Sequence, residues 1–130
     1  MNDCLFCKII NKEISSEIIY EDDKVLVFLD INPTTNGDTL IIPKKHSKDM
    51  FDIEDDLLIY MNNIYKKLYP IYKEKLLCDG LTFTTNLDYA QEIKHFHMHF
   101  IPRYTNDEVK YLSNKEILKD LKEIKNILKD

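Results

Sequence analysis

Apolar and polar positions follow two different periods along this chain. Short apolar runs bounded by turn residues or prolines predict five β-strands, at Ile18–Tyr20, Val25–Leu29, Thr39–Ile42, Leu81–Thr85 and His95–Ile101. From Asp52 to Leu77, apolar residues recur every three or four positions and predict one long amphipathic helix. We expect Asp52 to cap this helix and Pro70 to kink or split it, because proline removes a backbone donor.

Two further helical segments are expected at the ends of the chain. A short helix or turn over Asp3–Lys12 carries two cysteines. Near the other end, Ser113–Glu116 matches a capping box, and an apolar stripe follows at Ile117, Leu121, Ile124 and Leu128. We expect this last helix to pack on the body of the protein or on a partner subunit. The order of elements predicts an α+β fold with a mainly antiparallel five-stranded sheet, a long helix and a C-terminal helix.

Composition narrows the class of protein. The 130 residues fit one domain, and 23 acidic against 18 basic residues give a net charge of −5, which argues against nucleic-acid binding. The longest apolar runs, Val25–Leu29 and Leu57–Met61, are too short for a membrane span or a secretory segment. We therefore expect a soluble, cytoplasmic protein. Gly37 and Gly80 are the only glycines, so the glycine-rich phosphate-binding motifs cannot be formed.

Three of the four histidines lie within five residues, at His95, His97 and His99, and they alternate with large apolar side chains. A strand has a side-chain period of two, so all three imidazoles share one face and the apolar residues share the other. A polar face turned to water is one interpretation, and metal binding is another. His95 and His99 would lie about 13 Å apart along a strand, too far to share one tetrahedral ion. We therefore expect these histidines to have different roles.

Cysteines supply further candidate metal ligands. Cys4 and Cys7 have the CxxC spacing of half a zinc site, and His46 follows the third predicted strand. With one outer histidine of the cluster they would complete a Cys₂His₂ site. The alternatives for the CxxC pair are a redox pair or two unconnected thiols. Cys78 ends an apolar stretch and is expected to be a small buried side chain.

The remaining histidines suit phosphate chemistry. A neutral imidazole can attack phosphorus when an acceptor, often a backbone carbonyl, holds the proton on its other nitrogen. A second imidazole can bind the phosphoryl oxygens or assist the leaving group. The central position makes His97 the candidate nucleophile.

Four stretches of the chain match one known family. Residues Gln91–Arg103 resemble the His-φ-His-φ-His-φ-φ signature of the histidine triad (HIT) nucleotide hydrolases and transferases, with the Ile-Pro-Arg that commonly follows. Cys4–Ile10, Phe28–Pro33 and Leu40–His46 extend the resemblance. It covers residues 1–104, which we interpret as a HIT domain, with residues 105–130 as a C-terminal helical extension.

The resemblance implies a homodimeric, zinc-containing enzyme that acts on purine nucleotides such as AMP and its conjugates: phosphoramidates, adenylates or dinucleoside polyphosphates. His97 would attack the α-phosphate to form a nucleotidyl-histidine, and His99 would contact the phosphate. The other nucleotide-binding residues implied are Phe6, Ile18, Asp30, Ile31, Asn86 and Gln91, with Asp30 on the ribose hydroxyls. The implied zinc ligands are Cys4, Cys7, His46 and His95.

The chain departs from the family pattern near the histidines. Relatives usually have Gly-His where this chain has Gly37-Asp38, and Gly-Gln-Ser or Gly-Gln-Thr where it has Ala90-Gln91-Glu92. The loop from Gly80 to Gln91 is also about two residues shorter than usual. Asp38 and Glu92 favour one alternative to the hydrolase hypothesis, a nucleotide-binding interaction module with little turnover. A separate alternative is a metallohydrolase that uses zinc directly.

Overall fold

Five strands form one antiparallel sheet in the order β1-β2-β3-β5-β4. The structure is a computed structural model that describes residues 3–108 and 118–129. Its elements are α1 (Leu5–Ile10), β1 (Ile18–Glu21), β2 (Val25–Leu29), β3 (Thr39–Pro43), α2 (Asp55–Leu76), β4 (Gly80–Thr84), the 3₁₀ turn η1 (Asp88–Ala90), β5 (Met98–Arg103) and α3 (Leu121–Lys129). This arrangement confirms the predicted α+β fold and its antiparallel sheet.

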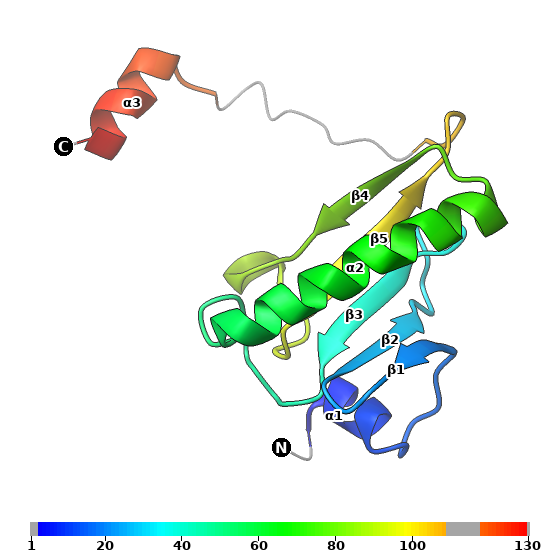
Figure 1. Cartoon of the computed structure of the whole chain (residues 1–130). Coiled ribbons are helices and arrows are strands. Elements are labelled where there is room, and N and C mark those ends of the chain that lie inside the picture. The colour runs from blue at the N-terminus through cyan, green and yellow to red at the C-terminus, as the bar shows by residue number, and fades with distance from the viewer. Residues whose placement is uncertain (1–2, 109–117, 130) are drawn as a thin grey trace.

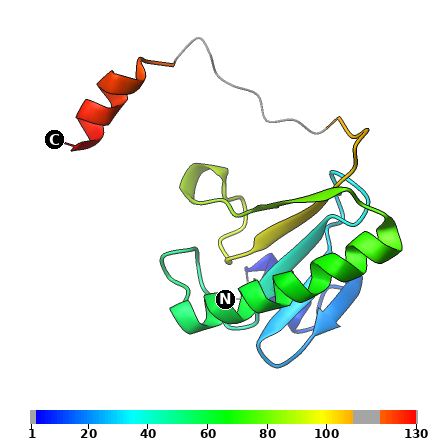
Figure 2. The same cartoon turned by 45° about the horizontal axis from the view of Figure 1, so that its top comes forward.

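The sheet has apolar cover on both faces. The long helix α2 lies across one face, and α1 lies near the opposite face, beside β1 and β3 (Figures 1 and 2). Strand β2 shows the consequence: Val25 and Val27 belong to the core beneath α2, whereas Leu26 and Phe28 pack with Phe6 of α1. Because both faces are covered, β2 is a continuous apolar run and not an alternating one.

The start of α2 differs from the prediction. The helix begins at Asp55 after Glu54, which makes no side-chain capping bond. The predicted cap Asp52 belongs to the preceding turn, where its carboxylate accepts a hydrogen bond from Lys48 N–H (2.7 Å). Asp49 closes that turn through bonds from Phe51 N–H and Asp52 N–H. The assignment of Asp52 as the N-cap was therefore wrong, because a separate turn uses its carboxylate before the helix starts.

Pro70 does not split the long helix. Figure 1 shows α2 as one continuous helix, and its residues run without a break from Asp55 to Leu76. Pro70 is exposed, while Leu68 and Tyr72 on either side of it are buried against the sheet. The Tyr72 hydroxyl also lies 2.7 Å from Thr39 Oγ1 of β3. These contacts hold the helix on both sides of the missing backbone donor.

The histidine segment enters the sheet later than predicted. Strand β5 begins at Met98 and not at His95, and it pairs with β3 only through Met98, His99 and Phe100. Before it, Phe96 N–H donates to Ser47 O (2.6 Å), outside the sheet. The alternation of faces nevertheless holds, since Phe96, Met98 and Phe100 all belong to the core beneath α2. The strand also passes through Pro102, which pairs with Leu81 of β4.

The C-terminal segment contains the predicted helix only in part. Helix α3 spans Leu121–Lys129, and none of its residues is buried, so packing on the body of the protein is not observed for it. The predicted capping box Ser113–Glu116 and Ile117 lie outside the described residues. Among the residues that the structure describes, no helix combines the length and the apolarity that a bilayer span requires.

The two glycines give a matched test of backbone strain. Gly37 has φ +92°, and a Cβ there would lie 2.5 Å from Leu76 Cδ1 and 3.1 Å from Pro102 Cγ. A Cβ on Gly80 would meet only Arg103 Cβ, at 3.8 Å. We predict that Gly37→Ala lowers the free energy of unfolding by about 1–3 kcal/mol in denaturant titrations, because alanine disfavours positive φ. Gly80→Ala should change it by less than about 0.5 kcal/mol. Equal unfolding midpoints for the two variants would contradict this.

Candidate functional site: a four-donor cluster beside a histidine-lined cavity

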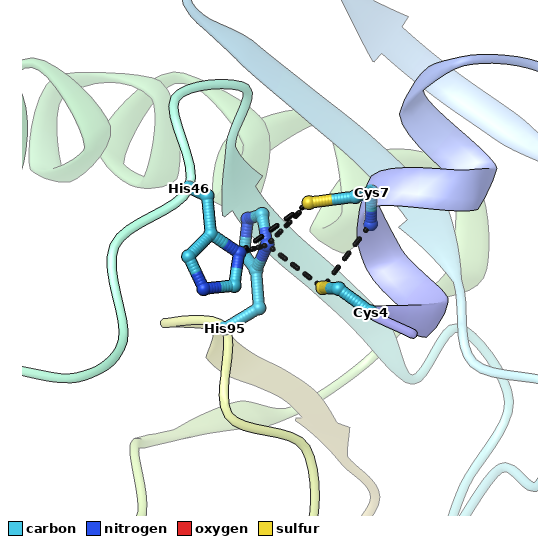
Figure 3. A group of neighbouring side chains, drawn as sticks. All are labelled: Cys4, Cys7, His46 and His95. Atoms are coloured by element: carbon cyan, nitrogen blue, oxygen red, sulfur yellow. Dashed lines mark hydrogen bonds between the residues drawn. The ribbon is translucent and has the colours of Figure 1, made fainter. Parts of the chain in front are cut away.

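Four side chains from three segments converge at one end of the sheet. Cys4 and Cys7 lie at the start of α1, His46 follows β3, and His95 precedes β5 (Figure 3). Cys4 is the N-cap of α1, and its sulfur accepts from Cys7 N–H (3.3 Å), which brings both thiols to the same end of the helix. The donor atoms of all four residues lie within 4.8 Å of one another. The structure thus brings together the four predicted metal ligands.

The spacing of the donors fits a tetrahedral zinc ion. Zn–N bonds of 2.0–2.1 Å and Zn–S bonds of 2.3 Å place neighbouring ligands about 3.3–3.8 Å apart. His95 Nδ1 lies 3.4 Å from Cys4 Sγ and 3.6 Å from Cys7 Sγ. His46 Nδ1 lies 3.3 Å from Cys7 Sγ and 3.1 Å from His95 Nδ1. His95 Nε2 donates to Pro43 O (2.8 Å), which leaves its Nδ1 lone pair turned towards the other donors.

Protonation states in the cluster also suit a cation. Burial lowers the pKa of His95 to about 4, and the His46 and His97 rings act in the same direction, so the imidazole is neutral. Burial and the adjacent Cys4 sulfur raise the pKa of the Cys7 thiol to about 11. Thiolates in this position therefore need a positive charge beside them, which a bound Zn²⁺ would supply. All four tetrahedral positions would then be held by protein side chains.

A cavity of about 500 Å³ adjoins this cluster on the α1 side of the sheet. It brings together six of the predicted catalytic and nucleotide-binding residues: Phe6, Asp30, Ile31, Asn86, His97 and His99. Much of its wall is apolar, from residues that the sequence had not singled out: Leu5, Ile9, Ile14, Phe28, Leu40 and Ile93. Only their position along the strands could have identified them in the sequence, since Phe28 and Leu40 lie on the strand faces that α1 covers. Glu92, the acidic departure from the family pattern, also lines the cavity.

Two predicted nucleotide-binding residues do not line the cavity. Ile18 is an exposed residue of the edge strand β1. The Gln91 side chain is buried and donates to Lys48 O (2.7 Å) and Ile93 O (3.0 Å), so it braces the loop before the histidines. Its amide is occupied by backbone carbonyls, a use that the residue type alone does not reveal.

His97 has the protonation that a nucleophile requires. Its Nδ1 lies 2.7 Å from His95 O, and because a carbonyl can only accept, Nδ1 carries the proton. Burial lowers the pKa of His97, so the ring is neutral and Nε2 keeps its lone pair. Phe6 packs against the ring edge-on, with the centroids 5.0 Å apart. The backbone acceptor expected for an attacking imidazole is therefore present.

The protein is therefore an α+β domain in which one segment places His95 in a four-donor cluster and His97 and His99 in the lining of the adjoining cavity. The HIT domain family model matches residues 11–106. An uncharacterized HIT-like protein of Methanocaldococcus jannaschii is 43% identical over 128 residues, covering 92% of this chain and 98% of that protein. The chain belongs to the HIT family.

Solved structures of the family agree with this fold. A zinc-bound histidine triad family protein from Mycobacterium smegmatis superposes with a TM-score of 0.80 at 32% identity, over 87% of this chain and 84% of that one. A HIT family hydrolase from Clostridium thermocellum has a TM-score of 0.72 at 32% identity, over 86% of this chain and 99% of that one.

Removal of one cluster thiol should remove the metal. We predict that Cys7→Ser lowers zinc content from about one ion per chain to near zero and lowers the thermal midpoint by at least about 5 °C, because metal binding contributes to folding. Zinc should also be released on acidification, since protons compete for the sulfur and imidazole donors. Elemental analysis and calorimetry measure these effects.

Cys78→Ala is the control, because Cys78 is buried in the core beneath α2 and its substitution should leave the zinc content unchanged. Equal zinc content in the two variants would refute the ligand set.

Proposed function

We propose that this HIT protein is a nucleotide hydrolase that cleaves purine nucleoside phosphate conjugates at the α-phosphate through a nucleotidyl-histidine intermediate. The observation that carries the proposal is the bond from His97 Nδ1–H to His95 O, which leaves Nε2 free to attack. His97 and His99 are the proposed catalytic residues, and their rings lie 5.0 Å apart beside one cavity.

The reaction divides into two displacements. In the first, the His97 Nε2 lone pair forms a bond to the α-phosphorus while the bond from phosphorus to the leaving group breaks, and the leaving group takes up a proton. In the second, water attacks the same phosphorus and gives up one proton, the P–N bond breaks, and the nucleoside monophosphate leaves with His97 neutral again. His99 is placed to contact the phosphoryl oxygens or to move the leaving-group proton.

The cavity supplies the remaining nucleotide contacts. We assign Phe6 and Ile31 to the purine, Asp30 to the ribose hydroxyls and Asn86 to the phosphate, because all four line the cavity with His97. We do not assign direct contacts to Ile18 and Gln91, which lie outside it. The proposed assembly is a homodimer of HIT domains formed by residues 1–104, each with residues 105–130 as a helical extension.

The four-donor cluster has a structural role in this proposal. Bound zinc would fix α1, which carries Phe6, to the segment that carries His97. Because four protein side chains complete its tetrahedron, zinc would have no open position for substrate, which argues against a metallohydrolase.

A nucleotide-binding module with little turnover is the second candidate. Asp38 replaces the usual histidine and lies diagonally across the sheet from His99, and Glu92 lines the cavity, so both departures lie close to the proposed chemistry. Tight AMP binding without turnover of any AMP conjugate would favour this candidate over the hydrolase.

The nucleophile assignment predicts a large and specific loss of activity. His97→Ala should lower kcat for an AMP–amine conjugate by at least about 10³-fold, because the covalent step loses its attacking atom. Acid-quench mass spectrometry should detect a nucleotidyl adduct on the wild-type protein and none on the variant. Zinc content and the far-ultraviolet circular dichroism of the variant serve as controls for folding. Equal turnover by the two proteins would refute the role of His97.

The charge of the cavity predicts a preference among conjugates. Asp30 and Glu92 line it, and among the described residues no lysine or arginine does. A dinucleoside polyphosphate brings additional negative charge next to the α-phosphate, whereas an amine conjugate does not. We predict that Glu92→Gln raises kcat/KM for a dinucleoside polyphosphate by about fivefold, as expected for removing a repulsion of about 1 kcal/mol. The gain should shrink at high salt.

Steady-state assays on both substrate types measure this preference. Turnover of the AMP–amine conjugate should change less than twofold, and Glu74→Gln, an exposed position on α2, should change neither rate. An equal effect of Glu92→Gln on both substrates would show that its charge does not select between them.

A further inference from the structure

Among the described residues, two buried side-chain polar atoms have no hydrogen-bond partner, namely Asp38 Oδ1 and His99 Nε2. An unpaired buried polar atom costs free energy, so native proteins contain few of them. One of these atoms can only accept when the carboxyl is ionised, and the other can carry a proton. Their chemistry is therefore complementary.

Sheet geometry places these two residues near each other on one face of the sheet. Thr39 pairs with Phe100, and Leu40 pairs with His99. Asp38 precedes Thr39, so it shares a face with Leu40 and is the diagonal neighbour of His99 across the β3–β5 ladder. This is the face that lines the cavity. Asp38 is only 3% exposed, so its carboxylate is buried on this face.

The orientation of the Asp38 carboxylate is already determined by its other contacts. Its Oδ2 accepts a hydrogen bond from Thr34 N–H (2.9 Å), and its backbone carbonyl accepts one from Asp30 N–H (3.0 Å). Burial raises the pKa of the Asp38 carboxyl and the nearby Asp30 charge adds to this, whereas Thr34 and His99 act in the opposite direction. His99 is therefore a favourable neighbour of this carboxylate.

We propose that Asp38 is a positioning residue that accepts a hydrogen bond from His99 Nε2–H, directly or through one bridging water. With Nε2 bonded to Asp38, Nδ1 is the nitrogen that remains for the cavity, which His99 lines. The consequence for catalysis rests on the proposed hydrolase function. In its imidazolium form, with a proton on each nitrogen, His99 donates the Nδ1 proton to the leaving group as the phosphorus–leaving-group bond breaks. Nδ1 regains a proton from the water that later attacks the α-phosphorus, as the bond from His97 Nε2 to phosphorus breaks. The Asp38 carboxylate stabilises the imidazolium form in this cycle.

The variant Asp38→Asn tests this proposal, because it keeps the bond from Thr34 N–H and replaces the acceptor that faces His99 by a donor. An asparagine carbonyl can still accept from Thr34 N–H, but its NH₂ group would then face His99 Nε2. A donor in that place requires Nε2 without a proton. Neutral His99 should therefore change from the Nε2–H tautomer in the wild-type protein to the Nδ1–H tautomer in Asp38→Asn. Long-range ¹H–¹⁵N spectra of the imidazoles in the zinc-loaded, ligand-free protein measure this directly. His99→Gln assigns the signals, since the chain has only four histidines.

The second measurement compares the loss of kcat for two substrates with different leaving groups. An amine must be protonated to leave, whereas p-nitrophenolate leaves without a proton. Asp38→Asn should therefore lower kcat for an AMP–amine conjugate by at least about 100-fold, within the range for general acid–base catalysis. The p-nitrophenyl ester of AMP should lose less than about tenfold. Asp38→Ala, which also removes the acceptor for Thr34 N–H, should show the same dependence on leaving group.

Each result decides one question. An unchanged His99 tautomer in Asp38→Asn, or equal losses for both leaving groups, would overturn the positioning role. Normal activity of Asp38→Asn with an impaired Asp38→Ala would also overturn it, because the Thr34 bond alone would then matter. If the wild-type protein cleaves neither substrate, the proposed hydrolase function fails, and the tautomer measurement still decides whether Asp38 binds His99.

Discussion

Residues 95–100 place alternate side chains on opposite sides of the sheet, in the core on one side and in the site on the other. The rest of the structure depends on this alternation. Phe96, Met98 and Phe100 fill the core beneath α2, while His95 and His97 face α1 and its cavity. A one-residue slip of this segment would put imidazoles into the core and phenyl rings into the cavity. The large apolar residues therefore fix the register of the histidines, and the chemistry of the site depends on the packing of the core.

A division of labour follows from that register. His95 belongs to the four-donor cluster, and His97 turns to the cavity beside Phe6. The two residues are also linked directly, because His95 O accepts the Nδ1 proton of His97. A metal that fixes His95 would thus also fix the carbonyl that sets the tautomer of the proposed nucleophile. Through this hydrogen bond, the cluster would affect the orientation and tautomer of His97 without contacting the substrate.

The acidic residues at the cavity distinguish this chain from the usual sequence pattern of the HIT family. Asp30 lies opposite Asp38, where Asp30 N–H donates to Asp38 O, so two carboxylates lie near each other just beyond the end of β2 and before the start of β3. Like charges in such a position oppose each other, and burial adds to the cost for Asp38. A neighbouring imidazole that can carry a proton offsets this cost. In the proposed role, this imidazole would bring a proton to a cavity whose described lining has no lysine or arginine.

The sequence by itself determined the features that depend on local pattern and composition. Short apolar runs between turn residues predicted the five strands, and the 3.6-residue period predicted the long helix. The alternation at His95–Phe100 separated imidazoles from core residues. Residue type and spacing proposed Cys4, Cys7 and His46 as metal ligands and His97 as the nucleophile, and resemblance to the HIT family added His95 as the fourth ligand. These assignments depend on residue type and spacing, which sequence records directly.

Tertiary structure decided which partner each polar group takes. The carboxylate of Asp52 bonds to Lys48 N–H before the helix begins, and the amide of Gln91 bonds to carbonyls of its own loop and of Lys48. Neither choice follows from the residue type, because each group has several possible partners and only the folded chain places one of them within reach. The proximity of Asp38 to His99 has the same origin, since 61 positions separate them in sequence and only the β3–β5 pairing joins them.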